Sequence, residues 1–234
     1  MAKTCAVVAA AGQSTRMGGI SKQLLPLAGV PVLVRSLQAL EQVPALDEIV
    51  LVAPPDSLPE FSETAARWGL KKIMSVVPGG INRQQSVFFG LLAVPSGCRV
   101  VLVHDGARPL VSKKEIEEVI KAAGEFGAAT LAVPVKDTVK VADPHGFVAE
   151  TPDRKNLWLT HTPQGFLFDV LMEAHRVASG KEDLHTDDAS LVEAFGHRVK
   201  LVAGSYSNIK ITTPEDILIA EALLEVRGLK FEVR

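Results

Sequence analysis

Short apolar segments rich in β-branched residues alternate with amphipathic helical segments along most of this chain. The apolar segments are residues 5–11, 48–53, 72–77, 99–105 and 129–135. Between them, apolar residues recur every three or four positions in residues 31–43, 56–68, 82–94 and 112–126, which is typical of helices packed on a sheet. Because parallel strands need crossover helices and are buried on both faces, the alternation predicts an α/β fold with a mostly parallel sheet flanked by helices.

The alternation is interrupted after Val135. Residues 137–150 form two short alternating runs around the turn sequence DPHG, which predicts a protruding β-hairpin arm. The sequence contains no internal repeat, low-complexity tract or linker. We therefore expect a single domain over residues 1–234, with an arm inserted at about 136–160.

The C-terminal third returns to the earlier pattern. It predicts helices near residues 168–178 and 186–195, and a strand at 198–202. A last helix should begin at TTPED, where Thr213 is a suitable N-cap and Pro214 suits the first helical position.

Composition limits the partners and the location of the protein. Its formal net charge is −2, whereas proteins that bind nucleic acid or anionic membranes usually carry a marked cationic excess. Cys5 and Cys98 are too few for a disulfide framework or a zinc site, and no apolar run is long enough to span a membrane. We expect a cytoplasmic protein with no nucleic-acid or membrane partner.

The loop after the first predicted strand, AAAGQSTRMGG, combines small residues with two nearby cations, Arg16 and Lys22. Ligands of open α/β sheets bind beyond the carboxyl ends of the strands. Small residues let backbone amides approach an anion, and the two cations add charge that does not depend on protonation at pH 7. The loop therefore predicts a polyphosphate site. The alternative is that Gly12, Gly18 and Gly19 are turn residues and that Arg16 and Lys22 are solvated surface charges.

This loop matches neither of two familiar phosphate-binding patterns. The dinucleotide fingerprint GxGxxG fails because Gly12 is followed by Gln13 and Ser14, and no acid ends a strand at the required distance. The P-loop pair of glycine and lysine followed by serine or threonine is also absent. An NAD-dependent oxidoreductase and a P-loop NTPase are therefore disfavoured.

Two later strand ends carry further candidate residues. Gly79 and Gly80 follow the third segment, where bare backbone is open to a base or a phosphate, and Asn82 is a candidate N-cap. Asp105 ends the fourth segment, with Arg108 three residues on. Its carboxylate suits a magnesium ion bound to nucleotide phosphates, although an Asp-Gly turn with a structural ion pair explains the same residues.

Covalent catalysis has no evident nucleophile in this sequence. No Ser-His-Asp or Cys-His set is suggested by the spacing. His185 is a weak metal candidate, because Thr186, Asp187 and Asp188 beside it are explained more simply as helix caps and first-turn acids.

Taken together, eight segments resemble one family in order and spacing, the 2-C-methyl-D-erythritol 4-phosphate cytidylyltransferases of the non-mevalonate isoprenoid pathway. They are AAAGQSTRMG, KQLLPLAGVPVLVRSL, PGGINRQQSV, VHDGARPLV, VPVKDTVK, TPQGF, TDDASLVE and NIKITTPEDI. The first is shared by many sugar-nucleotide transferases, whereas the last two are much more specific. The resemblance covers nearly the whole chain.

The resemblance implies a fold, an activity and an assembly. The fold would be a Rossmann-like sheet of the nucleotide-diphospho-sugar transferase type. The enzyme would transfer CMP from CTP to 2-C-methyl-D-erythritol 4-phosphate, release pyrophosphate and use Mg²⁺. Members form homodimers by exchanging the arm, so we expect a homodimer here.

The resemblance also implies roles for individual residues. Arg16 and Lys22 match the catalytic cations, and Asp105 matches an acid at the nucleotide and the metal. The other matches to the nucleotide site are Ala10, Ala11, Gly12, Gly80 and Ser86. The matches to the acceptor side are Arg108, Thr138, Arg154, Thr162 and Lys210.

The sequence departs from the family pattern in the first loop. Many members have glycine where this chain has Ser14 and proline where it has Ser21, and the stretch from Arg16 to Lys22 is a residue shorter than in some relatives. These changes bear on the pose of Lys22. Two alternatives stay open, a cytidylyltransferase for another polyol phosphate such as ribitol 5-phosphate, and a nucleotide-binding module without catalysis.

Overall fold

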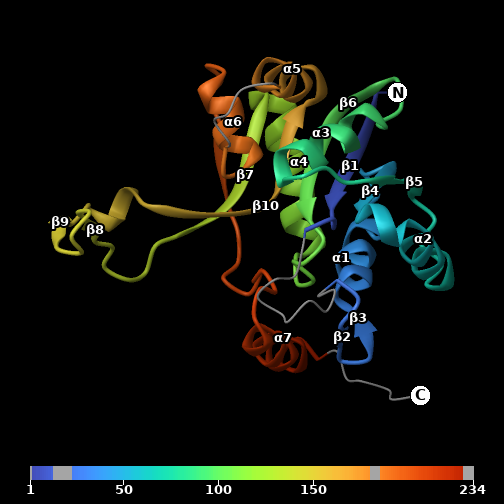
Figure 1. Cartoon of the computed structure of the whole chain (residues 1–234), viewed down its shortest axis with the longest axis horizontal. Coiled ribbons are helices and arrows are strands. Elements are labelled where there is room, and N and C mark those ends of the chain that lie inside the picture. The colour runs from blue at the N-terminus through green and yellow to red at the C-terminus, as the bar shows by residue number, and fades with distance from the viewer. Residues whose placement is uncertain (1, 13–22, 180–184, 229–234) are drawn as a thin grey trace.

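The computed structural model describes residues 2–12, 23–179 and 185–228. Its centre is a seven-stranded sheet in the order β11-β7-β10-β6-β1-β4-β5 (Figure 1). The strands are β1 Lys3–Ala9, β4 Glu48–Ala53, β5 Ile73–Pro78, β6 Cys98–Asp105, β7 Ala128–Pro134, β10 Trp158–Leu167 and β11 Lys200–Ala203. Neighbouring strands pair in parallel except at β10, which is antiparallel to both β6 and β7. The prediction of a mostly parallel α/β sheet is confirmed.

Helices cover both faces of this sheet. One core cluster joins one face of the sheet to α1 Val32–Glu41, α2 Leu58–Arg67 and α4 Lys113–Phe126. A second cluster joins the other face to α3 Arg83–Leu92, α5 Phe168–Ala178 and α6 Asp188–Ala194. Ala6 and Val8 belong to the first cluster and Val7 to the second, as expected because successive side chains of a strand point to opposite faces.

Smaller elements extend this three-layer body. The helix α7 Pro214–Val226 packs near the two-stranded ladder of β2 Pro26–Leu27 and β3 Val30–Pro31, and the 3₁₀ turn η2 Pro55–Ser57 precedes α2. The predicted start of α7 is confirmed, with Thr213 at the N-cap and Pro214 at the start of the helix. Asp216 completes this start by accepting a hydrogen bond from the Thr213 amide at 2.8 Å.

The arm leaves β7 and returns at β10, and it projects well away from the body (Figure 1). It carries the short ladder of β8 Val141–Ala142 and β9 Val148–Glu150, followed by the 3₁₀ turn η3 Arg154–Asn156. Residues 158–160, which the sequence prediction placed in the arm, instead pair with β7 in the central sheet.

The strand β10 was not predicted from the sequence. It contains Pro163 and Gly165, which are unfavourable in a central strand. The structure accommodates Pro163 because the pairing of β10 with β7 shifts register between Thr160 and Gln164. A proline has no amide proton to donate, so a break in the ladder is where it is tolerated.

Two helical glycines give a matched test of the packing. A Cβ on Gly90, in α3, would lie 2.4 Å from Val7 Cγ1 and 2.8 Å from Val52 Cγ2, whereas a Cβ on Gly124, in α4, would meet nothing within 4 Å. We expect Gly90→Ala to lower the free energy of unfolding by about 1–3 kcal/mol through overpacking. Gly124→Ala should raise it by about 0.5–1 kcal/mol, because alanine favours the helix. Urea unfolding of both variants measures the difference, and equal effects would contradict the described packing.

Candidate active site

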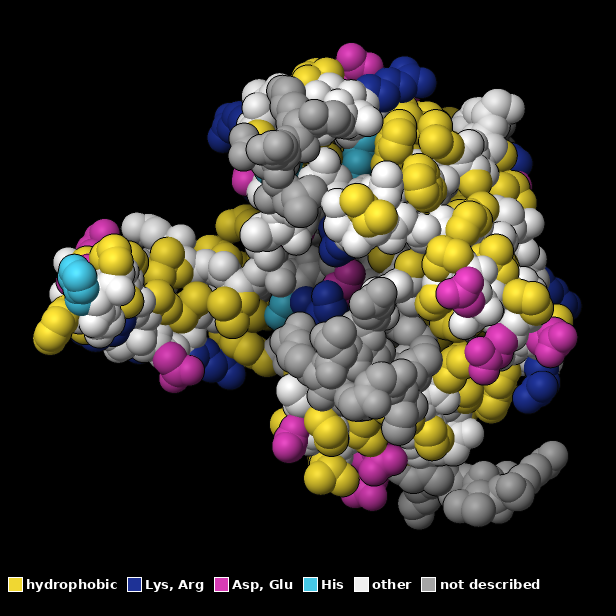
Figure 2. Space-filling model, in the orientation of Figure 1, with side chains coloured by type: hydrophobic (Ala, Val, Ile, Leu, Met, Phe, Trp, Pro, Cys, Tyr) yellow, Lys and Arg dark blue, Asp and Glu magenta, His cyan; other side chains and the backbone are white. Residues whose placement is uncertain are grey.

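A cavity of about 650 Å³ opens at the carboxyl ends of the parallel strands. Figure 2 shows a hollow near the middle of the molecule, with basic and acidic side chains at its floor. Six of the residues predicted for the site line the cavity, namely Ala11, Gly12, Gly80, Ser86, Asp105 and Lys210. The described start of the predicted polyphosphate loop, Ala11 and Gly12, therefore borders a cavity together with two later strand ends.

Bare backbone forms the wall of the cavity beside β1. The amide of Ala10 donates to the carbonyl of Val52 at 2.8 Å, so the hydrogen bonding to β4 continues one residue beyond the end of β1. A Cβ on Gly79 would lie only 2.2 Å from the Cβ of Ala11. Because no larger side chain fits between them, the loops after β1 and β5 lie in direct contact at this wall.

The loop between β5 and α3 is held by its own side chains. Asn82 caps α3 as predicted, with its side chain accepting from the amide of Gln85 at 2.8 Å. The Ser86 hydroxyl accepts from the Gly80 amide at 3.0 Å and donates to the Asn82 carbonyl at 2.8 Å. The hydroxyl of Ser86 thus fixes the Gly80 backbone at the edge of the cavity.

Three cations surround the carboxylate of Asp105 at the end of β6. Its oxygens lie 2.8 Å from Lys210 Nζ, 3.5 Å from Arg83 Nε and 3.7 Å from Arg108 Nε. Burial by itself would raise the pKa of Asp105, but Lys210, Arg83 and Arg108 hold it well below its usual range. The carboxylate is therefore ionised at neutral pH, and positive charge outnumbers negative charge around it.

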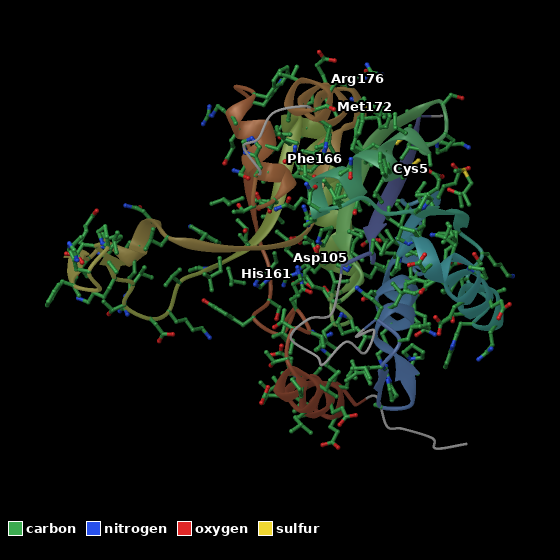
Figure 3. The ribbon with its side chains drawn as sticks, viewed as in Figure 1. Cys5, Asp105, His161, Phe166, Met172 and Arg176 are labelled. Atoms are coloured by element: carbon green, nitrogen blue, oxygen red, sulfur yellow. The ribbon has the colours of Figure 1, made fainter. Side chains whose placement is uncertain are left out.

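The segment that carries Lys210 is fastened to the neighbouring strands. Arg108 Nη1 donates to the carbonyl of Asn208 at 2.7 Å, and Asn208 Nδ2 donates to the carbonyl of Thr162 at 2.9 Å. Thr162 Oγ1 in turn accepts from the Asp105 amide at 3.0 Å. The predicted residues Arg108, Thr162 and Lys210 therefore belong to one connected group around Asp105, and Figure 3 shows Asp105 at this end of the sheet.

The donor set fits a magnesium ion that enters with a nucleotide. Within residues 2–12, 23–179 and 185–228, no group of three or more acidic, histidine or cysteine side chains is placed to hold a metal. Mg²⁺ is usually bound through one or two carboxylates together with substrate phosphates and water. If such an ion binds with the substrate, the ionised carboxylate of Asp105, which lines the cavity, would supply the protein ligand.

The remaining predicted residues lie elsewhere. Thr138 and Arg154 are exposed on the arm, where Arg154 Nη1 donates to the carbonyl of Lys136 at 2.8 Å. Because the arm projects from the body (Figure 1), the fold does not bring these two side chains to the cavity of their own chain. Arg16 and Lys22 lie outside the described residues.

Arg83 is a cavity residue that the sequence prediction missed. It is the first residue of α3, directly after the Asn82 cap. Helix N-termini favour acidic side chains because of the helix dipole, so a basic residue at this position was an available signal. Its partners, Asp105 and Asp188, are distant in sequence and become neighbours only in the fold.

The sheet and its cavity are typical of the α/β proteins that bind phosphate-bearing ligands, because cations gather beyond the carboxyl ends of the parallel strands. Comparison with known proteins is more specific. The family model of 2-C-methyl-D-erythritol 4-phosphate cytidylyltransferase matches residues 4–226. The chain belongs to this family, and the resemblance predicted from the sequence is confirmed.

Individual relatives match over nearly their whole length. The chain is 52% identical over 229 residues to 2-C-methyl-D-erythritol 4-phosphate cytidylyltransferase of Pelotomaculum thermopropionicum, covering 97% of this chain and 96% of the relative. The enzyme of the same name from Desulforamulus reducens is 49% identical, with 97% and 98% covered.

Solved structures agree with these sequence matches. The crystal structure of 4-diphosphocytidyl-2C-methyl-D-erythritol synthase from Anaerococcus prevotii has a TM-score of 0.86 at 34% identity, covering 95% of this chain and 96% of that one. The cytidylyltransferase from Thermus thermophilus has a TM-score of 0.79 at 34% identity, covering 95% and 99%. In the described part of this chain, no helix has the length and apolar character needed to cross a membrane.

His104 makes the stability of the fold depend on pH. The ring is fully buried beside Asp105, its Nδ1 lies 3.1 Å from Thr162 Oγ1, and burial lowers its pKa to about 4. The unfolded chain, with a histidine pKa of about 6.5, binds the proton more readily. Stability from the neutral ring is therefore complete above about pH 6.5 and decreases as the pH falls towards 4, by about 2 kcal/mol at pH 5.

Urea unfolding at pH 7 and pH 5 tests this expectation. The wild type should lose more unfolding free energy between the two pH values than His104→Gln, which lacks the titrating ring. His161, whose pKa burial also lowers to about 4, is present in both proteins and cancels in the comparison. An equal loss in both proteins would contradict the assignment.

Proposed function

We propose that this protein transfers CMP from CTP to 2-C-methyl-D-erythritol 4-phosphate, with release of pyrophosphate. The product is 4-diphosphocytidyl-2-C-methyl-D-erythritol. The observation that carries the proposal is the cavity at the sheet end, where Lys210, Arg83 and Arg108 converge on Asp105. Family membership over residues 4–226 supports the same reaction and favours methylerythritol phosphate over ribitol 5-phosphate as acceptor.

The main barrier to this reaction is electrostatic. A phosphate oxygen of the acceptor attacks the α-phosphorus of CTP in line, and the bond from that phosphorus to the pyrophosphate oxygen breaks. The attacking phosphate is already an anion, so no strong general base is required. Fixed cations that bring two polyanions together, and that meet the charge developing on the α-phosphoryl oxygens, lower the barrier directly.

We assign the two substrates to opposite sides of Asp105. The backbone wall of Ala11, Gly12 and Gly80 suits the nucleotide, with Ser86 and the buried Ala10 behind it. Arg108, Thr162 and Lys210 suit the acceptor phosphate. Arg16 and Lys22 are the proposed donors to the α-phosphoryl group. Magnesium, held by Asp105 and the nucleotide phosphates, would neutralise part of the triphosphate charge.

We further propose a homodimer in which the arm completes the partner's site. The arm and its base expose several large apolar side chains, Val141, Phe147, Val148 and Leu159, of which Phe147 is 72% exposed. Clustered apolar exposure of this kind marks interaction surfaces. Thr138 and Arg154 on the arm would then reach the acceptor in a neighbouring site, and a bidentate arginine suits a phosphate dianion. We place this enzyme in the cytoplasm, in keeping with the sparse cysteines.

The first test concerns the catalytic cations. Arg16→Ala and Lys22→Ala should each lower kcat by about a hundredfold to a thousandfold, because each removes a donor to developing charge. Their Michaelis constants for CTP should change much less. Pyrophosphate release under saturating substrates measures the effect, and Lys114→Ala, an exposed cation on α4, serves as control. Near-normal kcat in both site variants would reject their assignment.

The second test concerns sharing of the site between subunits. Arg154→Ala should raise the Michaelis constant for the acceptor phosphate and leave that for CTP nearly unchanged. At an acceptor concentration where both parent variants show little activity, mixed dimers of Lys22→Ala and Arg154→Ala chains should recover part of the activity, because one of their two sites contains neither substitution. Mixed dimers that are confirmed by mass and remain inactive would contradict sharing.

One assay separates the remaining alternatives. CTP is incubated with methylerythritol 4-phosphate or with ribitol 5-phosphate, and pyrophosphate release is followed. We expect release with the first acceptor and little with the second. Release with ribitol 5-phosphate alone would transfer the assignment to the other polyol, and nucleotide binding without release from either would indicate a binding module.

A further inference from the structure

The segment TDDASLVE is specific to the family resemblance, but nothing in the proposed reaction explains its acids. Asp187 is the N-cap of α6, where its side chain accepts from the Ser190 amide at 2.8 Å. Asp188 is different, because its carboxylate is 2% exposed and accepts hydrogen bonds from two side chains. Arg83 Nη1 lies 2.7 Å from Oδ2, and His175 Nε2 lies 3.0 Å from Oδ1.

Arg83 links this buried acid to the cavity. Its Nη1 contacts Asp188 while its Nε lies 3.5 Å from Asp105, so one guanidinium joins two carboxylates. Its side chain is 29% exposed and lines the cavity. The two acids belong to α6 and β6, which are far apart in the sequence.

Asp188 is itself held firmly from the sheet side. Gln164 Oε1 accepts from the amides of Asp188 and Ala189, each at 3.1 Å. Gln164 Nε2 donates to Asp187 Oδ2 at 2.7 Å and to Thr130 Oγ1 at 3.0 Å. The start of α6 is thereby fixed to β10 and β7.

His175, the other side chain that contacts the carboxylate of Asp188, packs against α3. The ring of His175, on α5, stacks on the ring of Phe88 with centroids 6.0 Å apart and an interplanar angle of 9°. Phe88 lies on the same helix that begins at Arg83. The acid thus has little freedom to move, and it holds the guanidinium in one orientation.

Arg83 needs such a partner. It occupies the first turn of α3, where the helix dipole disfavours a cation. A long side chain also loses considerable rotamer freedom when it is held in place. Without a buried carboxylate behind it, the guanidinium would gain entropy by turning towards water.

We propose that Asp188, supported by His175, is a positioning residue that directs Arg83 towards Asp105 and the wall of the cavity. Arg83 contacts the carboxylate of Asp105 from α3, whereas Lys210 and Arg108 contact it from other segments of the chain. When Arg83 loses this orientation, the carboxylate of Asp105 is held only by Lys210 and Arg108, which lie on the side that we assign to the acceptor. The proposal rests on the proposed function for its kinetic consequence, but the orientation of Arg83 is independent of it.

The kinetic test is a double-mutant cycle. Asp188→Asn keeps the shape of the side chain and removes its charge, and misorientation of a site group by about 1 Å costs on the order of a hundredfold in rate. We expect kcat to fall by about tenfold to a hundredfold. In an Arg83→Ala background the same change should cost less than about twofold, because Asp188 acts through Arg83. Multiplicative losses in the cycle would overturn the proposal.

The matched control is Asp187→Asn, at the preceding position. It weakens the cap of α6 and the contact to Gln164 without touching Arg83, so we expect lower stability with kcat nearly unchanged. A kcat loss equal to that of Asp188→Asn would show a merely structural effect. If Asp188→Asn does not fold, Arg83→Lys replaces it, because an ammonium keeps the charge but cannot span both acids; near-normal kcat in that variant would overturn the proposal.

A readout without substrates separates this proposal from the proposed function. The side-chain Nε–H signal of Arg83, assigned by its loss in Arg83→Lys, should be sharp and shifted in the wild type and in Asp187→Asn, and averaged with solvent-exposed arginines in Asp188→Asn. Averaging already in the wild type would overturn the positioning role. A wild type that shows the ordered signal but releases no pyrophosphate would reject the proposed function and leave the positioning role supported.

Discussion

The carboxylate of Asp105 is the point on which the site depends. It ends a central strand, is almost fully buried, and stays ionised because Lys210, Arg83 and Arg108 lie around it. Removing an ionised group from water is costly unless charged partners and hydrogen bonds compensate it. The cations come from three different segments, so this one constraint ties the start of α3, the loop after β6 and the segment before α7 together at the sheet end.

The antiparallel strand β10 is the second structural element of the site. It places Thr162 against the Asp105 amide and Gln164 against the start of α6. It also returns the chain from the arm into the sheet, so the arm and the cavity share one strand. The register shift between Thr160 and Gln164 lies at this junction, and irregularities in a ladder are frequent beside active sites.

The residues predicted to bind the acceptor lie in two places, at the cavity and on the arm. Arg108, Thr162 and Lys210 surround Asp105, whereas Thr138 and Arg154 are exposed on the arm, which projects away from the cavity of its own chain. A single chain therefore presents an incomplete set of the residues that the family resemblance assigns to one substrate. The proposed exchange of the arm between two chains would bring these residues to one site, which is why the dimer is part of the proposed mechanism.

The sequence alone determined the sheet type, most element positions and the family. The reason is that apolar periodicity and capping residues are local signals, as at Asn82 and Thr213, and that the family segments keep their order along the chain. The strand β10 escaped prediction because Pro163 and Gly165 are locally unfavourable there and are tolerated through tertiary pairing. Only the tertiary structure decided that Arg83 stands between Asp105 and Asp188, since electrostatic partners are chosen by proximity in space and leave no periodic trace in the sequence.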